Sequence, residues 1–136
     1  MTAPATRPPQ NHQATFRMPL DFASVSADTT VWMYGAKSRS IRVTRVHLAL
    51  ASTQAADGSN YVNFKLIKGA STIVANWSTQ TGHEGTITGS TAAELVLTST
   101  AADYFVNDGD KLSLLIDTTG TITVPAGRIV VEGTEY

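Results

Sequence analysis

The feature that most constrains the fold is the alternation of apolar and polar residues in short runs, each closed by a turn signal. The best example is the run from residue 40 to residue 50. Its apolar positions are Ile41, Val43, Val46, Leu48 and Leu50, so the phase slips by one residue after Val43. A period of two is typical of a half-buried β-strand. A slip of one residue is what a β-bulge produces, and we place that bulge near Thr44-Arg45.

Similar runs recur along the rest of the chain. The predicted strands cover residues 16–20, 30–34, 62–66, 72–77, 94–98, 104–106, 112–116, 121–124 and 128–132, with a further short one at 85–88. Gly-rich and Asp/Asn-rich turn signals separate them. Helical periodicity is not convincing anywhere, and its weak exception is residues 20–30, which fit a helical turn or a loop. Short strands separated by turn signals every 8–12 residues or so indicate an all-β fold, an antiparallel sandwich or barrel.

The first 15 residues differ from the rest of the chain. Pro4, Pro8 and Pro9 stand among Thr, Ala, Gln and Asn, without an apolar pattern. Such segments favour extended, polyproline-like conformations. We therefore divide the chain into an extended N-terminal arm, residues 1–15, and one β-sandwich domain, residues 16–136. The first strand of that domain contains Pro19, which predicts an edge strand because proline cannot donate to a central ladder.

Composition limits the chemistry and the location that we expect for this chain. Charged residues make up 15% of the chain, against about a quarter in typical domains. Cysteine is absent, which excludes disulfides, thiolate zinc sites and cysteine nucleophiles. We find no apolar run long enough for a membrane span and no apolar stretch of a signal peptide at the N-terminus. The expected location is therefore the cytoplasm of a cell until release, without membrane contact.

The two halves of the chain differ in charge. Residues 1–68 carry a net charge of +5 and residues 69–136 a net charge of −6. The asymmetry fits nucleic-acid binding or charge-complementary packing between subunits. It fits equally well an arrangement in which strands from both halves mix in space and the charges cancel.

No pattern of catalytic or metal-ligating residues emerges. The histidines, His12, His47 and His83, lack metal-ligand spacing. Asp108-Gly109-Asp110 is better explained as a tight turn with glycine at positive φ than as a calcium loop. A nucleophile elbow, a phosphate loop and a dinucleotide fingerprint are all missing. The chain is therefore predicted to be non-enzymatic and to use no cofactor.

Two sets of residues are candidates for binding. Arg39, Arg42 and Arg45 cluster near the main strand, and salt bridges across an interface explain them better than a nucleic-acid patch. Their spacing by three puts successive arginines on opposite faces of a strand unless the bulge realigns them. A sugar-stacking platform is an alternative use of the aromatic residues, although packing in the core or an interface is favoured. These residues are Trp32, Tyr34, Tyr61, Trp77 and Tyr104.

The chain resembles a known family in three stretches. They are Ile41-Arg42-Val43-Thr44-Arg45-Val46-His47-Leu48, then Val62-Asn63-Phe64-Lys65-Leu66-Ile67-Lys68-Gly69, then Val106-Asn107-Asp108-Gly109-Asp110-Lys111-Leu112-Ser113-Leu114, before a closing Val130-Val131-Glu132-Gly133. The arrangement is similar to the small jelly-roll-like β-sandwich proteins of tailed-phage virions, notably capsid decoration (cement) proteins. The resemblance implies a bacteriophage structural protein on the outer capsid surface. Such a protein is commonly a homotrimer that clamps neighbouring major capsid subunits, without direct contact to nucleic acid.

From this resemblance we expect the arm to lie across capsid subunits or to swap into a neighbouring protomer, and the arginines to meet an acidic capsid surface. The expected partner-binding residues are Pro8, Pro9, Phe16, Arg17, Arg39, Arg42 and Arg45. Two alternatives stay open. One is a carbohydrate- or receptor-binding β-sandwich module of a phage fibre or tail, and the other is a tail or connector subunit.

Overall fold

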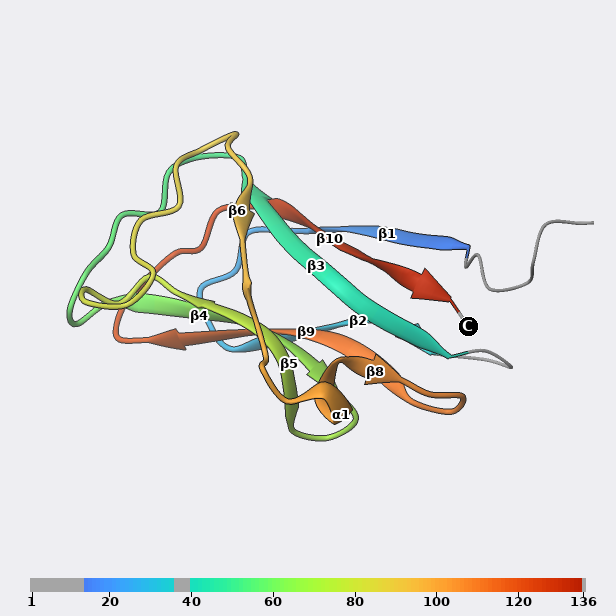
Figure 1. The fold of residues 1–136 in the computed structure, drawn as a ribbon. Helices are drawn as coiled ribbons and strands as arrows, with labels where there is room; N and C mark the ends of the chain where they lie inside the picture. The colour runs from blue at the N-terminus through green and yellow to red at the C-terminus, as the bar shows by residue number, and fades with distance from the viewer. Residues whose placement is uncertain (1–13, 36–39, 136) are drawn as a thin grey trace, which may run out of the picture.

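The computed structural model describes residues 14–35 and 40–135, which form two antiparallel sheets packed face to face (Figure 1). The first sheet has the order β1-β10-β3-β6, and β8 also pairs with β3. Its strands are β1 (Thr15–Phe22), β10 (Gly127–Glu135), β3 (Ile41–Leu50), β6 (Ala93–Glu94) and β8 (Phe105–Val106). The second sheet has the order β2-β9-β4-β5-β7. Its strands are β2 (Thr29–Gly35), β9 (Lys111–Thr119), β4 (Tyr61–Lys68), β5 (Thr72–Ser78) and β7 (Val96–Leu97).

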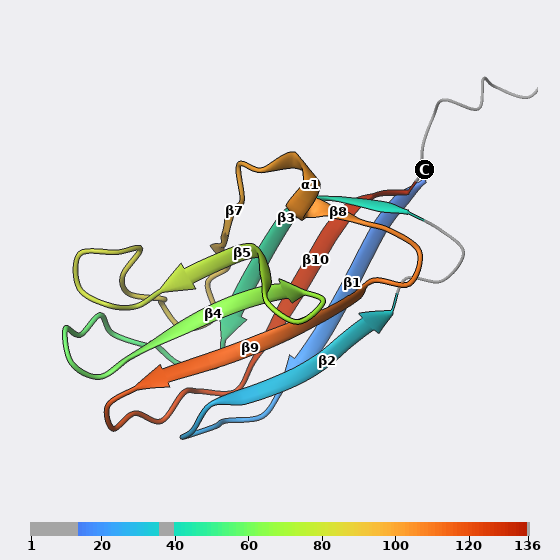
Figure 2. The same cartoon turned by 90° about the horizontal axis from the view of Figure 1, so that it is seen from below.

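The strand pairing follows one rule along the chain. The first strand, β1, pairs with the last, β10, and the second, β2, pairs with the last but one, β9. Further in, β3 pairs with β6 and β8, and β4 pairs with β5. A long hairpin rolled up in this way is the jelly roll. Figure 2 shows β1 and β2 along the same side of the sandwich. The predicted all-β, jelly-roll-like sandwich is confirmed.

The core lies between the two sheets. Its largest fully buried side chains come from both of them and include Ile41, Leu48, Leu50, Phe64, Leu66, Leu112, Leu114, Ile116 and Ile129. They occupy every second position of their strands, which is why alternation in the sequence identified them. Burial of these side chains stabilises the fold by about 1.5–3 kcal/mol each relative to exposure.

The predicted bulge in β3 is confirmed. Arg45 pairs with Glu132 and Val43 pairs with Gly133, so Thr44 is an extra residue in the ladder. The insertion places both Thr44 and Arg45 on the surface and returns Val46 to the core. It also realigns the arginines, because Arg42 and Arg45 are now both exposed.

Two further bulges are found in the second sheet, and the sequence analysis did not predict them. The register shifts between Trp32 and Tyr34 in β2, and between Leu66 and Ile67 in the β4–β5 pair. In the β4–β5 pair the extra residue is Val74, since Ala75 pairs with Leu66 and Ile73 pairs with Ile67. As a result Val74 is fully buried and Ile73 is exposed.

The single strand predicted over residues 94–98 is wrong. Ala93 and Glu94 pair with β3 of the first sheet, whereas Val96 and Leu97 pair with β5 of the second. The buried residue between them, Leu95, marks the crossing, and its N–H donates to the carbonyl of Val46.

Other local predictions also differ from the structure. Residues 20–30 contain no helix, because β1 continues to Phe22 and a loop follows. Residues 121–124 and 85–88 make only isolated bridges, at Val124 and Ile87. A four-residue helix, α1 (Ala101–Tyr104), was not predicted. By contrast, β1 is an edge strand as its proline indicated, pairing only with β10 among the described residues. The expected arm is not tested, because residues 1–13 lie outside the described part of the chain.

Candidate functional site

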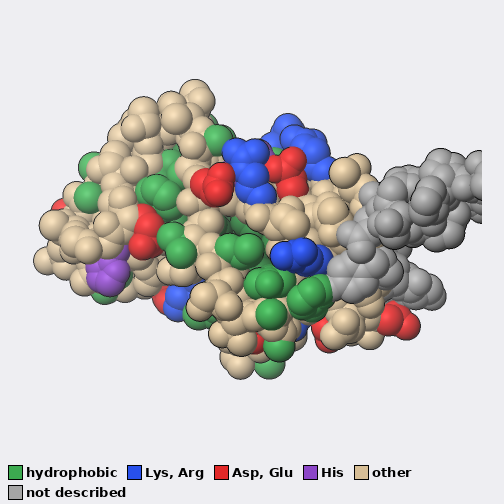
Figure 3. Space-filling view, in the orientation of Figure 1, with side chains coloured by type: hydrophobic (Ala, Val, Ile, Leu, Met, Phe, Trp, Pro, Cys, Tyr) green, Lys and Arg blue, Asp and Glu red, His purple; other side chains and the backbone are tan. Residues whose placement is uncertain are grey.

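The outer face of the first sheet, here called the charged face, carries rows of opposite charges. Arg17 lies opposite Glu132 in the β1–β10 ladder, and Glu132 lies opposite Arg45 in the β10–β3 ladder. Asp21 and Arg128 are likewise opposite each other. In Figure 3, basic and acidic side chains lie side by side at the top of the view. Cross-strand pairs of opposite charge favour this register.

The contacts on the charged face are close. Arg45 Nε lies 2.9 Å from Glu94 Oε1, and Arg45 Nη1 lies 3.4 Å from Glu132 Oε1. Arg128 Nε lies 2.6 Å from Asp21 Oδ1, and this hydrogen bond lowers the pKa of the Asp21 carboxyl. The two Arg45 pairs join a cation of the basic half to acids of the acidic half, whereas Arg128–Asp21 joins the halves with the charges reversed. Strands from both halves therefore mix on this face, and part of the charge asymmetry is offset within one chain.

The outer face of the second sheet, here called the apolar face, has the opposite character. Among the described residues the exposed large hydrophobic side chains are Trp32, Ile73 and Val96, with 68%, 41% and 53% of their surfaces exposed. They come from β2, β5 and β7, which all belong to this sheet. Scattered exposed apolar residues need no explanation, but a set confined to one face is typical of an interaction surface.

The strand register aligns part of this set in one row. Trp32 lies opposite Ser113, Ser113 lies opposite Ile67, and Ile67 lies opposite Ile73. Ile67 faces outward but is only 7% exposed, and it is not part of the core cluster. With strands about 4.8 Å apart, the row from Trp32 to Ile73 extends about 14 Å across the sheet. An ion pair borders it, with Lys65 Nζ 3.0 Å from Asp117 Oδ2.

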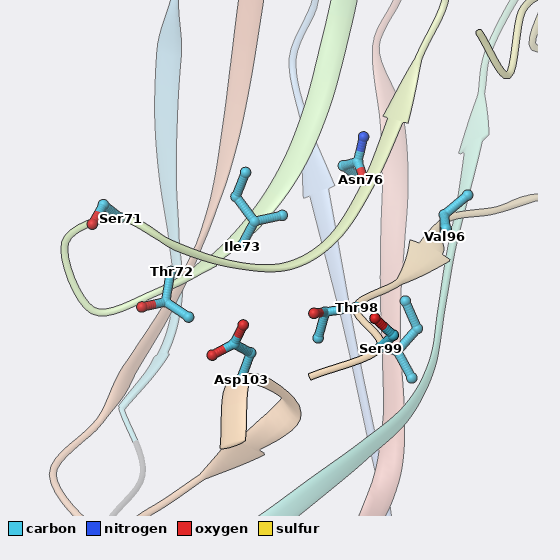
Figure 4. Close-up of a pocket in the computed structure, with 9 residues that line it drawn as sticks. Ser71, Thr72, Ile73, Asn76, Val96, Thr98, Ser99 and Asp103 are labelled. Carbon is cyan, nitrogen blue, oxygen red and sulfur yellow. The ribbon is translucent and has the colours of Figure 1, made fainter. Parts of the chain in front are cut away.

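A groove of about 700 Å³ adjoins this row at the β5–β7 edge. Ile73 and Val96 form apolar parts of its wall, and Asp103 of α1 lies across from them (Figure 4). The other lining residues are mostly hydroxyl or amide side chains: Ser71, Thr72, Asn76, Thr98 and Ser99. The groove thus combines an apolar wall with hydrogen-bonding groups and one carboxylate, a mixture suited to a partner's side chain.

At the opposite edge of the apolar face a second hollow surrounds Trp32. It measures about 330 Å³ and is lined by Trp32, Met33, Tyr34, Gly35 and Lys111. Lys111 Nζ lies 6.0 Å from the centre of the Trp32 ring, within the range of a cation–π contact. Tryptophan is one of the residues most enriched in binding hot spots, so Trp32 is a candidate anchor.

The structure brings together three of the predicted partner-binding residues. Phe16, Arg17 and Arg45 line a hollow of about 440 Å³ on the charged face, beside the Thr44 bulge. Phe16 is half-buried and makes an edge-to-face contact with Tyr34, at 5.2 Å between ring centres. It therefore also closes one end of the sandwich.

The remaining predicted residues are not part of that hollow. Arg42 lies apart, with its guanidinium carbon 5.6 Å from the centre of the Tyr104 ring. Pro8, Pro9 and Arg39 lie outside the described residues. The role of these residues in partner binding stays a prediction.

The five aromatic residues do not form one platform. Trp77 is half-buried against the core, and its indole N–H donates to the carbonyl of Gly85 at 2.9 Å. Tyr34 and Tyr104 also pack against the core. Trp32 instead projects from β2. Sequence reasoning named Trp32 but missed Ile73 and Val96, because only the bulge at Val74 and the crossing at Leu95 turn those two outward.

Titratable residues add no catalytic geometry. Within residues 14–35 and 40–135, no group of three or more His, Asp or Glu side chains is placed to hold a metal ion. Asp110 accepts a hydrogen bond from the N–H of Asn107, and Gly109 has φ of +92°, so the Asp108–Asp110 segment is the predicted tight turn. No helix in the described part of the chain has the length and hydropathy to cross a membrane.

The fold and these surfaces define a jelly-roll β-sandwich with one apolar and one charged outer face. Neither a scan against protein-family models nor a search of curated proteins found a match. Among solved structures, the chain is similar to a chain in the structure of the infectious bursal disease virus Gx strain. The TM-score is 0.44 at 11% identity, and the match covers 98% of this chain and 36% of that chain. The present chain thus spans about a third of the length of that neighbour.

Proposed function

We propose that this chain is a virion structural protein, a capsid decoration or cement protein that binds the outer capsid surface and stabilises contacts between major capsid subunits. The observation that carries the proposal is the apolar face. Its exposed Trp32, Ile73 and Val96 belong to one sheet, which carries the Lys65–Asp117 pair, while the opposite sheet carries the ion pairs of Arg45 and Arg128. A small module with one apolar and one charged face fits a protein that lies on a larger surface.

The jelly-roll topology supports this proposal, since viral capsid domains are one of the classes that use it. The likeness of residues 40–133 to decoration proteins points the same way. In this account the apolar face meets the capsid, with Trp32 and Ile73 as anchors and the groove beside Ile73 receiving a side chain of the major capsid protein. The charged face then points to solvent, on the capsid surface of the mature particle.

Lectin domains also use the jelly roll, so glycan binding is the competing function. Trp32 is the feature that favours it, because an exposed indole can stack on a sugar ring. A stacking platform, however, would need a second exposed aromatic residue beside it, and Tyr34, which lines the same hollow, packs against the core and Phe16 instead. Two exposed apolar side chains at the ends of one row, Trp32 and Ile73, are better suited to a protein surface.

Co-sedimentation with empty capsids, assembled from the major capsid protein of the same genome, tests the proposal. The wild-type chain is expected to sediment with capsids and to saturate. Ile73→Lys is expected to weaken binding at least about tenfold, because it places a charge in the apolar row. Thr44→Lys is the matched control, since Thr44 is exposed on the charged face and away from the row.

The outcomes distinguish an error in the proposed function from an error in the proposed binding face. If Ile73→Lys binds normally while Arg42→Glu or Arg45→Glu abolishes binding, the chain is a decoration protein that uses the charged face. If the wild-type chain does not sediment with capsids at all, the decoration function is wrong. Glycan-array binding that is lost in Trp32→Ala, with the fold intact, would favour the competing function.

A further inference from the structure

The two sheets end on the same side of the sandwich in two edge strands of different character. β1 contains Arg17, Pro19 and Asp21, and proline and charged residues are the usual means by which proteins prevent an edge strand from pairing with other chains. β2, with the sequence Thr-Thr-Val-Trp-Met-Tyr-Gly, has neither a charge nor a proline. Among the described residues it pairs only with β9, so its other edge carries backbone donors and acceptors that no described strand meets.

One exposed tryptophan and one exposed threonine accompany this open edge. Trp32 is 68% exposed, and Thr30 lies exposed on the same side of the strand. The bulge at Met33 interrupts the ladder and leaves Thr29–Trp32 as its regular part. An uncharged edge strand beside an exposed tryptophan is suited to β-augmentation, in which an extended segment adds to the sheet through backbone hydrogen bonds.

The position of the N-terminal segment identifies the occupant. Ala14 accepts a hydrogen bond from the N–H of Glu135, and Phe16 contacts Tyr34 near the end of β2. Ala14, the first described residue, therefore lies on the side of the sandwich that carries both edges. Fully extended, 13 residues reach about 43 Å, which is enough to cross to a neighbouring copy.

Residues 1–13 contain two parts that suit β-augmentation: residues 1–7 as the added strand and Pro8-Pro9 as a spacer. Residues 1–7 contain one proline, Pro4, which an added outer strand tolerates because every second N–H points away from the ladder. Pro8-Pro9 follows, and consecutive prolines favour an extended, stiff spacer, which disfavours a sharp reversal of the chain toward β2 of the same copy. A second copy is thus a better acceptor than the strand of the same copy.

We propose that residues 1–7 of one copy add as a strand to the open edge of β2 in a second copy, beside Trp32 of that copy, whose side chain stays on the outer face of the sheet. Because donor and acceptor are different surfaces, the contact is head-to-tail and closes into a ring where the rotation allows it. This inference concerns self-assembly and does not depend on attachment to a capsid.

The cysteine-free chain permits a direct test with full-length protein. One sample carries only Thr6→Cys and the other only Thr30→Cys, and the two are mixed and mildly oxidised. The expected product is a disulfide-linked pair that joins residue 6 of one copy to residue 30 of the other, identified by peptide mass. The matched control is Thr6→Cys mixed with Val96→Cys, which places the thiol at the opposite edge of the same sheet and is expected to give no specific product.

Self-association gives an independent readout. Thr30→Lys in the full-length chain is expected to weaken association at least about tenfold by sedimentation, because lysine on an edge strand opposes pairing. Val96→Lys is expected to leave association unchanged, and thermal melting checks that both variants are folded.

Three results would overturn the proposal. The first is efficient crosslinking between two Thr30→Cys copies without the arm cysteine, which would mean that β2 strands pair directly. The second comes from a chain that carries both Thr6→Cys and Thr30→Cys: a disulfide within that one chain, with none between the mixed single-cysteine copies. The third is a full-length wild-type protein that stays monomeric at all concentrations.

Discussion

Gly133 lies directly against the backbone of Arg42, and a Cβ atom at position 133 would overlap the carbonyl oxygen of Arg42. The contact occurs where β10 passes the Thr44 bulge, so the bulged strand approaches its neighbour too closely for a side chain. At this bulge the partner strand therefore has room only for glycine at position 133.

Gly133→Ala is therefore expected to destabilise the fold by about 1–3 kcal/mol, the usual cost of forcing extra atoms into a packed site. Urea unfolding measures the change. Gly58→Ala is the matched control, since no atom lies within 4 Å of a Cβ at that position, and it is expected to change the free energy of unfolding little. Equal effects of the two substitutions would contradict the register at the bulge.

Ile73 and Val74 are neighbours in sequence with opposite environments. Val74→Ala is expected to lower the free energy of unfolding by about 2 kcal/mol, because Val74 is fully buried and its truncation leaves a cavity. Ile73→Ala removes more atoms but is expected to cost well under about 1 kcal/mol, because Ile73 is exposed on the apolar face. The reverse order, measured by chemical denaturation, would show that the β5 bulge is placed wrongly.

Asp28 gives a prediction about pH. The backbone N–H and then the hydroxyl of Thr118 donate to its carboxylate, at 2.7 and 2.9 Å, and lower the pKa of Asp28 below the ordinary value of 3.8. A carboxyl with a lowered pKa in the folded state stabilises the fold above pH 3.8, and this contribution is lost as the pH falls through the lower, folded-state value.

Asp28→Asn keeps an oxygen acceptor but cannot titrate. It is expected to reduce the loss of stability between about pH 5 and about pH 2, followed as the urea midpoint at each pH. An unchanged pH dependence in Asp28→Asn would mean that Thr118 does not hold the charged form.

Features that depend on the local alternation of apolar and polar residues could be predicted from the sequence. Features that depend on which strand pairs with which could not. The slip after Val43 predicts the β3 bulge, because five apolar residues define the phase on both sides of it. The β5 bulge was missed because Ile73-Val74-Ala75 is a continuous apolar run, in which any phase looks acceptable. Nothing local in Leu95-Val96-Leu97 shows that the chain changes sheets there. The apolar face, which depends on both features, could therefore not be predicted.

The predicted partner-binding residues show the same limit. From the sequence alone, Arg45 was predicted to bind a partner. In the fold, however, Glu94 and Glu132 lie beside it and pair with it. These two acids lie far from Arg45 in sequence and reach it only through the β6 and β10 registers. Because the charge of Arg45 is paired within the chain, the apolar face is the surface that we expect to bind a partner.

The most direct test of the central claim is a cryo-electron microscopy map of capsids decorated with this protein. The account predicts density for the jelly roll on the outer capsid surface, with the β2-β9-β4-β5-β7 sheet against the major capsid protein and Ile73 in the contact. The sheet that carries Arg17 and Arg45 should face solvent. Density in which the charged face contacts the capsid, or capsids that carry no jelly roll at saturating protein, would contradict it.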